Sequence, residues 1–131
     1  MAVGDVYRFV SDQATGYESK PKLHVSLGAT DHFRAPAEFP FLFISSSDYD
    51  SCFPIALNDY GEFLTHDSYV SCGKLVYYSF AFLKSLNLKA VGRLTDNHLA
   101  ALRNHLADHD VMVRWEIAIA CEALKDFVAN P

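Results

Sequence analysis

Six side chains that can transfer protons or bind phosphate lie within nine consecutive residues near the middle of the chain. They are His66, Asp67, Ser68, Ser71, Cys72 and Lys74. An imidazole changes its charge near neutral pH, a neighbouring carboxylate can orient it, and hydroxyl and ammonium groups bind phosphate oxygens. His and Asp are also common in solvated turns, so the cluster has a purely structural interpretation too. The elements around it decide between the two.

The cluster interrupts a segment whose other residues favour β-structure. Residues 63–79 read FLTHDSYVSCGKLVYYS, and the branched and aromatic side chains at residues 69–70 and 75–78 suit a pleated surface. This segment predicts a strand, a polar connection and a second strand. Alternating or continuous apolar runs predict further strands at residues 4–10, 20–28, 41–45, 52–57 and 88–94. Pro54 places its strand at a sheet edge, whereas residues 79–86 fit a strand or a short helix.

The strand predicted at residues 20–28 carries a second group of polar side chains. Its two faces hold Leu23, Val25 and Leu27 on one side, and Lys22, His24 and Ser26 on the other. We expect the apolar face to be buried and the polar face to be solvated. His24 is then either a proton-transfer group or a solvated residue paired with a neighbouring strand. The buried strand predicted at residues 41–45 delivers three hydroxyls at its end, from Ser45, Ser46 and Ser47.

Two helices are predicted in the last third of the chain. The first spans residues 96–107, because Thr95 is a good N-cap and leucines recur at helical spacing after Asp96. The second spans residues 111–129 after an N-cap at Asp110, with one apolar stripe that faces a core or a second subunit. The stripe comprises Val113, Ile117, Ala120, Cys121, Leu124, Phe127 and Val128, and its flanking or opposite residues are Arg114, Glu116, Glu122 and Lys125.

We predict neither a metal site nor a cofactor. His105 and His109 have the i, i+4 spacing of two helical ligands, but no zinc signature surrounds them. The three cysteines are widely spaced, which is typical of reduced thiols in a cytosolic protein rather than of a disulfide framework. Cys121 falls on the apolar stripe, and Cys72 is the thiol to consider for reactivity.

The composition predicts a single domain over residues 1–131, with a barrel at about residues 3–94 followed by the two helices. Half of the residues are hydrophobic and 21% are charged, which excludes a disordered chain. We find neither an apolar stretch long enough to span a bilayer nor a signal peptide. A cytoplasmic protein without membrane contact is therefore expected.

The net charge of −5 argues against a broad nucleic-acid surface, but the charges are unevenly distributed. Residues 36–72 contain six carboxylates and neither Lys nor Arg, whereas basic residues cluster before and after this region. Any site for a polyanion must therefore be local.

The order of these segments resembles the PemK/MazF family. Four places carry the resemblance: GDVYRF at residues 4–9, KPKLHVSLG at 20–28, FLFISSS at 41–47, and residues 63–79 followed by VGRLTDNHLAALRNHL. Together they extend over about four-fifths of the chain and leave the last helix outside. The resemblance implies an α+β fold, namely a small SH3-like β-barrel (MazF/PemK/CcdB-like) with one or two C-terminal helices.

The family consists of endoribonucleases of type II toxin–antitoxin modules. The resemblance therefore implies a homodimeric, metal-independent enzyme that cleaves single-stranded RNA and binds a cognate antitoxin protein. Its basic residue before a proline matches Lys20, its hydroxyl after the buried strand matches Ser46 or a neighbour, and an acidic residue of some members matches Asp67. Cleavage by the 2′-hydroxyl of the RNA also requires proton exchange, which His24 or His66 could supply. The implied catalytic residues are Lys20, His24, Ser46, His66 and Asp67, and the implied substrate-binding residues are Lys22, Ser45, Ser47 and Lys74.

Two departures from the family favour a different function. The family usually has Arg where this chain has Lys20, and some members have Arg where this chain has Thr65. Arg binds a phosphate through two parallel hydrogen bonds, a geometry that Lys cannot reproduce. The alternative is a non-catalytic homodimeric interaction protein of the same fold, which binds a protein partner through residues 36–72 and the last helix.

Overall fold

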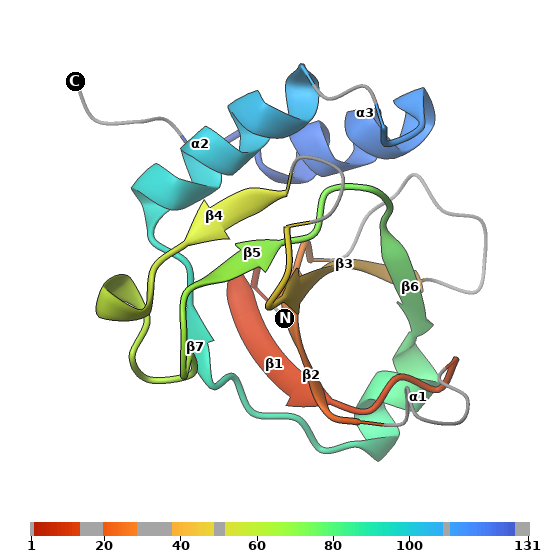
Figure 1. The fold of residues 1–131 in the computed structure, drawn as a ribbon. Coiled ribbons are helices and arrows are strands. Elements are labelled where there is room, and N and C mark those ends of the chain that lie inside the picture. The colour runs from red at the N-terminus through yellow and green to blue at the C-terminus, as the bar shows by residue number, and fades with distance from the viewer. Residues whose placement is uncertain (1, 14–19, 29–37, 49–51, 109–110, 128–131) are drawn as a thin grey trace.

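The computed structural model describes residues 2–13, 20–28, 38–48, 52–108 and 111–127, and these form an α+β fold (Figure 1). The strands are β1 (Asp5–Phe9), β2 (Lys22–Ser26), β3 (Glu38–Ser45), β4 (Phe53–Ile55), β5 (Ser68–Val70), β6 (Val76–Ser79) and β7 (Gly92–Arg93). The helices are α1 (Phe80–Ser85), α2 (Asp96–Ala107) and α3 (Arg114–Ala123), and a 3₁₀ turn, η2, spans Leu57–Asp59.

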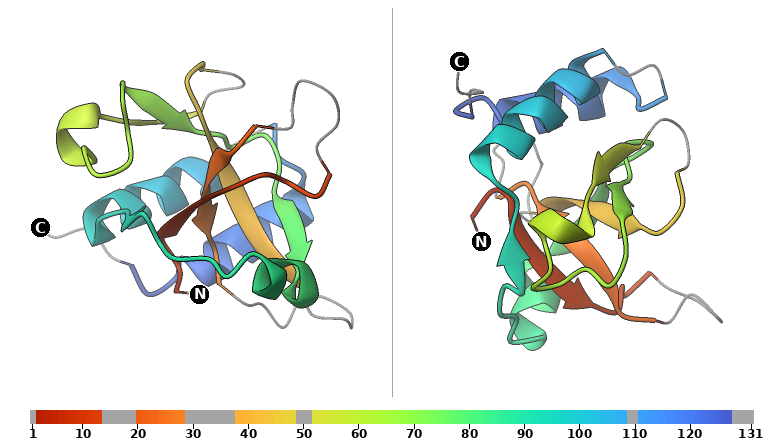
Figure 2. Two further views of the ribbon diagram at one scale, coloured as in Figure 1. Left: turned by 90° about the horizontal axis from the view of Figure 1, so that it is seen from below. Right: turned by 60° about the vertical axis from the view of Figure 1, so that its left-hand side comes forward.

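Strand β3 is the centre of a curled antiparallel sheet (Figures 1 and 2). The hydrogen-bonded order is β4-β5-β3-β2-β1-β7, and β6 also pairs with β3. One edge of β3 holds β2, while the other edge holds β6 along residues 38–41 and β5 at residues 44 and 45. Because β5 and β6 follow one another along the same edge, the sheet bends there into an open half-barrel. In the described part of the chain β4 pairs with β5 alone, which confirms the edge position predicted from Pro54.

The segment of residues 63–79 contains two strands with a polar connection between them, as predicted, but the first strand, β5, lies at Ser68–Val70, inside the polar cluster rather than before it. This connection, residues 71–75, joins β5 to β6, and the Ser71 amide donates to the carbonyl of Phe43 over 2.7 Å. The strand predicted at residues 88–94 is shorter than expected. Only Gly92 and Arg93 pair with β1, as β7.

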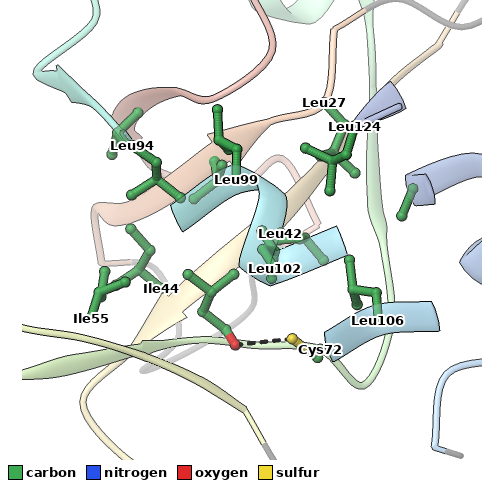
Figure 3. Close-up of a cluster of buried hydrophobic side chains, with 14 of the residues drawn as sticks. Leu27, Leu42, Ile44, Ile55, Cys72, Leu94, Leu99, Leu102, Leu106 and Leu124 are labelled. Carbon is green, nitrogen blue, oxygen red and sulfur yellow. Dashed lines mark hydrogen bonds between the residues drawn. The ribbon is translucent and has the colours of Figure 1, made fainter. Parts of the chain in front are cut away.

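The larger hydrophobic core lies between the sheet and helices α2 and α3 (Figure 3). Leucines of α2 meet apolar side chains from one face of the strands; among the fully buried members are Val6, Val25, Leu42, Leu99, Leu102, Leu106 and Leu124. Burial of each such side chain contributes about 1.5–3 kcal/mol. This core therefore holds the two C-terminal helices against the sheet.

Helix α2 has the predicted bounds, Asp96–Ala107. Thr95 is its N-cap, with extended backbone, and its hydroxyl accepts from the His98 amide over 3.2 Å. The hydroxyl of Tyr60 accepts from the Thr95 amide over 3.0 Å and also hydrogen-bonds Nδ1 of His98. Local capping and a tertiary partner thus define the same helix start.

A second, mostly aromatic cluster fills the other face of the strands. Its buried members are Tyr7, Phe9, Phe41, Val76, Tyr78 and Leu83. The short helix α1 contributes Leu83 and resolves the ambiguity of residues 79–86 in favour of a helix. Its first turn is capped by Ser79, whose hydroxyl accepts from the Phe82 amide over 3.2 Å.

This aromatic cluster overturns the expectation that β2 exposes a polar face. His24 and Ser26 are both 0% exposed. The ring of His24 stacks on Phe9 with centroids 3.9 Å apart, while the Ser26 hydroxyl accepts from the Gly28 amide over 3.0 Å. Each of these buried polar side chains has a hydrogen-bond partner inside the protein. Only Lys22, at the start of the strand, is exposed.

Helix α3 is shorter than the predicted helix of residues 111–129, since it begins at Arg114 after an extended Val113. Val113 is 52% exposed and does not belong to the buried stripe, whereas Ala120 and Leu124 are buried as predicted. Glu116, expected among the polar residues, is only 7% exposed. Its carboxylate accepts from the Leu75 amide over 3.2 Å and from the Tyr77 hydroxyl, which explains its burial. Asp110 and Val128 lie outside the described residues.

Candidate functional site

Two neighbouring pockets bring together most of the polar side chains that the sequence singles out. The first, here the lysine pocket, has a volume of about 360 Å³ and is lined by Lys20, Lys22 and Lys74 with Ser11, Gln13 and Tyr77. The second, the serine pocket, has about 250 Å³ and is lined by Arg8, Lys22, Ser45, Ser46, His66 and Ser68. Lys22 lines both pockets, so we treat them as one cationic groove.

The sheet positions the groove through the ends of its strands. Arg8 and Lys22 lie on the paired strands β1 and β2, and Ser45 ends β3 where it pairs with Tyr69 of β5. Lys74 lies in the connection between β5 and β6. Because that connection runs along the edge of β3, the bend in the sheet brings Lys74 towards Lys22 of β2 and Lys20 just before it.

Two contacts orient the cations of β1 and β2. The ammonium of Lys22 lies 5.3 Å from the ring centroid of Phe43, at a distance suited to a cation–π interaction. The guanidinium of Arg8 donates to the carbonyl of Phe63 over 3.3 Å. Both side chains are therefore held by the scaffold and still line the groove.

The groove is positive although the chain is acidic. The described residues that line it include lysines and an arginine but neither Asp nor Glu. The chain as a whole carries a net charge of −5. Such a concentration of one sign in a concave surface attracts ions of the opposite sign, which here means anions.

His66 is the exposed imidazole of the groove. Its Nδ1 lies 3.0 Å from the carbonyl of Asp67 and 3.2 Å from the hydroxyl of Ser68. A carbonyl oxygen only accepts, so Nδ1 carries the hydrogen and the neutral ring has its lone pair on Nε2. In the neutral ring, Nε2 is therefore the nitrogen that can accept a proton.

The carboxylate of Asp67 has a different partner from the one expected. Its Oδ1 accepts from the Leu57 amide over 2.9 Å and so holds the start of η2, while its backbone carbonyl contacts His66. Asp67 does not line either pocket as described. Ser47 is exposed beside the groove, and its amide donates to the Ser45 hydroxyl over 3.1 Å.

His24 is the predicted site residue farthest from solvent. Its Nδ1 is 2.9 Å from the carbonyl of Lys22, and its Nε2 is 3.0 Å from the hydroxyl of Tyr78. Burial lowers the pKa of His24 to about 4; the hydrogen bond with the Lys22 carbonyl partly opposes this shift, and the charge of Lys22 adds to it. In this arrangement both ring nitrogens are engaged inside the protein and neither is presented to a substrate.

Cys72 is also buried and is not placed to react as a nucleophile. Its side chain is fully buried, its thiol donates to the carbonyl of Val70 over 3.3 Å, and burial raises its pKa to about 12 (Figure 3). A thiol in this environment stays protonated, and the thiolate is the nucleophilic form.

Of the nine predicted site residues, six line the cationic groove. These are Lys20, Lys22, Lys74, Ser45, Ser46 and His66. His24, Asp67 and Ser47 do not line it. The structure adds Arg8, Gln13 and Ser68. Ser68 belongs to the polar cluster of residues 66–74, whereas Arg8 shares its strand face with the buried Val6 and is not marked by the alternation.

Among the described residues there is no group of three or more His, Cys, Asp or Glu side chains placed to hold a metal ion. Nor does any described helix have the length and apolar character needed to cross a bilayer. Comparison with protein-family models, with curated proteins and with solved structures found no match to the chain.

Proposed function

We propose that this protein is a PemK/MazF-like ribonuclease that binds single-stranded RNA in the cationic groove. The observation that carries the proposal is the groove itself, in which three lysines and an arginine converge in an otherwise acidic chain. A curled antiparallel sheet with appended helices supports an SH3-like barrel of that family. With this assignment come a homodimer and a cognate antitoxin protein as expected partners.

The serine pocket supplies the groups that cleavage requires. Nε2 of His66 accepts the proton of a ribose 2′-hydroxyl as its oxygen attacks the adjacent phosphorus. Arg8 and Lys22 stabilise the negative charge that develops on the phosphate, and the hydroxyls of Ser45 and Ser46 donate hydrogen bonds to its oxygens. The ammonium of Lys22 gives a proton to the departing 5′-oxygen. The products are a 2′,3′-cyclic phosphate and a 5′-hydroxyl.

RNA binding without cleavage is the second candidate. Only one of the two predicted imidazoles lines the groove, because His24 is buried. An acid–base pair would then depend on a lysine, whose ordinary pKa lies far above neutrality. In this candidate the same groove binds RNA and leaves it intact.

The test uses a labelled single-stranded RNA and a DNA of the same sequence, which lacks the 2′-hydroxyl. We expect binding of both, cleavage of the RNA alone, and loss of cleavage with retained binding in His66→Ala. Lys22→Ala should weaken binding, whereas Lys89→Ala, an exposed lysine outside the groove, should not. Binding without cleavage selects the second candidate, and absence of RNA binding at low salt would overturn both.

A further inference from the structure

The single tryptophan of the chain lies largely in solvent. Trp115, in the first turn of α3, is 58% exposed. Its indole lies parallel to the ring of Tyr77, with an interplanar angle of 7° and centroids 6.3 Å apart. The exposed face of an indole can stack on another flat ring.

Tyr77 is held rigidly behind the tryptophan. Its backbone pairs with β3 at Pro40, and its hydroxyl donates to the buried carboxylate of Glu116. Burial, and then this carboxylate, raise the pKa of Tyr77 well above its usual range, so the hydroxyl keeps its proton. Glu116 also accepts from the Leu75 amide, which fixes the start of α3 against β6. The ring of Tyr77 therefore has its orientation before any ligand arrives, and the first turn of α3, which carries Trp115, is fixed beside it.

Tyr77 connects this aromatic surface to the groove. It lines the lysine pocket together with Lys20, Lys22 and Lys74, and its ring faces Trp115. Its carbonyl also accepts from the side chain of Gln13, another residue of that pocket, over 2.9 Å. Tyr77 thus borders the lysine pocket and also contacts the ring of Trp115.

We propose that Trp115, supported by Tyr77, is a stacking platform for a base of single-stranded RNA whose phosphates contact the lysine pocket. This inference rests on the proposed function, since it extends the same groove. Charge complementarity favours nucleic acid over an apolar protein segment as the occupant, because the neighbouring pocket is cationic. Aromatic stacking next to a cationic track is the usual way in which proteins bind single strands.

The tryptophan is its own reporter, so the test follows its fluorescence. The probes are a single-stranded oligouridylate, an abasic oligonucleotide of the same length, and inorganic polyphosphate. We expect the oligouridylate to change the emission of Trp115, and the two probes without bases to bind with little change. Trp115→Ala should weaken oligouridylate binding about tenfold and leave polyphosphate binding unaltered, whereas Trp115→Phe should retain most of the affinity. Phe80→Ala, which removes an equally exposed ring from outside the groove, is the matched control.

The outcomes separate the platform from the groove. If RNA binds in a lysine-dependent manner, but the emission is unchanged and Trp115→Ala behaves like Phe80→Ala, the platform is wrong and the groove stands. If no probe binds, the proposed function and the platform fail together. If Trp115→Ala instead dissociates a dimer in sedimentation, with unchanged RNA affinity per protomer, Trp115 belongs to a protein interface. Circular dichroism of each variant excludes unfolding as the cause.

Discussion

Nε2 of His24 lies 3.0 Å from the hydroxyl of Tyr78 in the middle of the aromatic cluster. Since Nδ1 faces the carbonyl of Lys22, it must be the protonated nitrogen, and Nε2 accepts from Tyr78. Burial raises the pKa of Tyr78, which keeps that donor in place. The pair is complete only while the imidazole is neutral.

This pair predicts a loss of stability in mild acid. The folded protein protonates His24 with a pKa of about 4 and the unfolded chain near 6.5, so the unfolded state binds more protons between these values. The contribution of His24 is therefore complete above pH 6.5 and is lost as the pH falls towards 4. Between these two pKa values the free energy of unfolding should fall by about 3 kcal/mol.

Urea unfolding at a series of pH values measures this dependence. We expect His24→Gln, which cannot take up the proton, to flatten the dependence between pH 6.5 and 4. His66→Gln, a change at an exposed imidazole, should leave it in place. Equal pH dependence in the wild type and His24→Gln would contradict the prediction.

Glu116 should be the most sensitive polar position of α3. Glu116→Ala removes the acceptor of both the Leu75 amide and the Tyr77 hydroxyl, and loss of the acceptor of a buried donor such as the Leu75 amide costs about 1–3 kcal/mol. Glu116→Gln retains one oxygen and should lose less. Thermal unfolding compares these variants with Glu122→Ala, which removes an exposed ion pair with Lys125. A similar midpoint for Glu116→Ala and Glu122→Ala would refute the role of Glu116.

Removal of the cap of α2 should destabilise the protein by about 1 kcal/mol. Thr95→Ala deletes the hydroxyl that accepts from the His98 amide, and Thr95→Ser keeps it. The free energy of unfolding should therefore fall in the alanine variant and change little in the serine variant. If both variants lose the same amount, the methyl group rather than the hydrogen bond is what matters.

The lysine pocket predicts a specific salt dependence of RNA binding. Each lysine that neutralises a phosphate contributes about 0.7 to the slope of log affinity against log salt for a single strand. Lys20→Ala, Lys22→Ala and Lys74→Ala should each reduce the magnitude of the slope by about this amount. Trp115→Ala should lower the affinity and keep the slope, and Lys89→Ala should alter neither. Slopes that do not respond to the three lysines would show that the RNA lies elsewhere.

Local signals account for the parts of the fold that could be predicted. The cap at Thr95 and the leucines behind it define α2, and Pro54 marks an edge strand, because each effect acts within a few residues. It was harder to predict which face of a strand is buried. Polar alternation in β2 predicts a solvated face, but the cluster that covers His24 comes from distant strands and from α1.

In the site, too, local features could be predicted and contacts between distant segments could not. The residue types suited to phosphate binding could be read directly, and six of nine predicted residues meet in the groove. Arg8 could not be placed beside Ser46, because their proximity depends on how far the sheet curls. Glu116 could not be recognised as buried either, since its partner Tyr77 lies 39 residues earlier in the chain.

The groove and both hydrophobic clusters depend on the register of strand β3 against β2. The consecutive residues Phe41 and Leu42 of β3 point to opposite faces and enter different hydrophobic clusters. Ser45 at the end of β3 lines the serine pocket. A slip of one residue against β2 would turn every one of these side chains to the opposite face. The binding surface therefore cannot be shifted along this strand while the interior is kept, so the scaffold and its site can change only together.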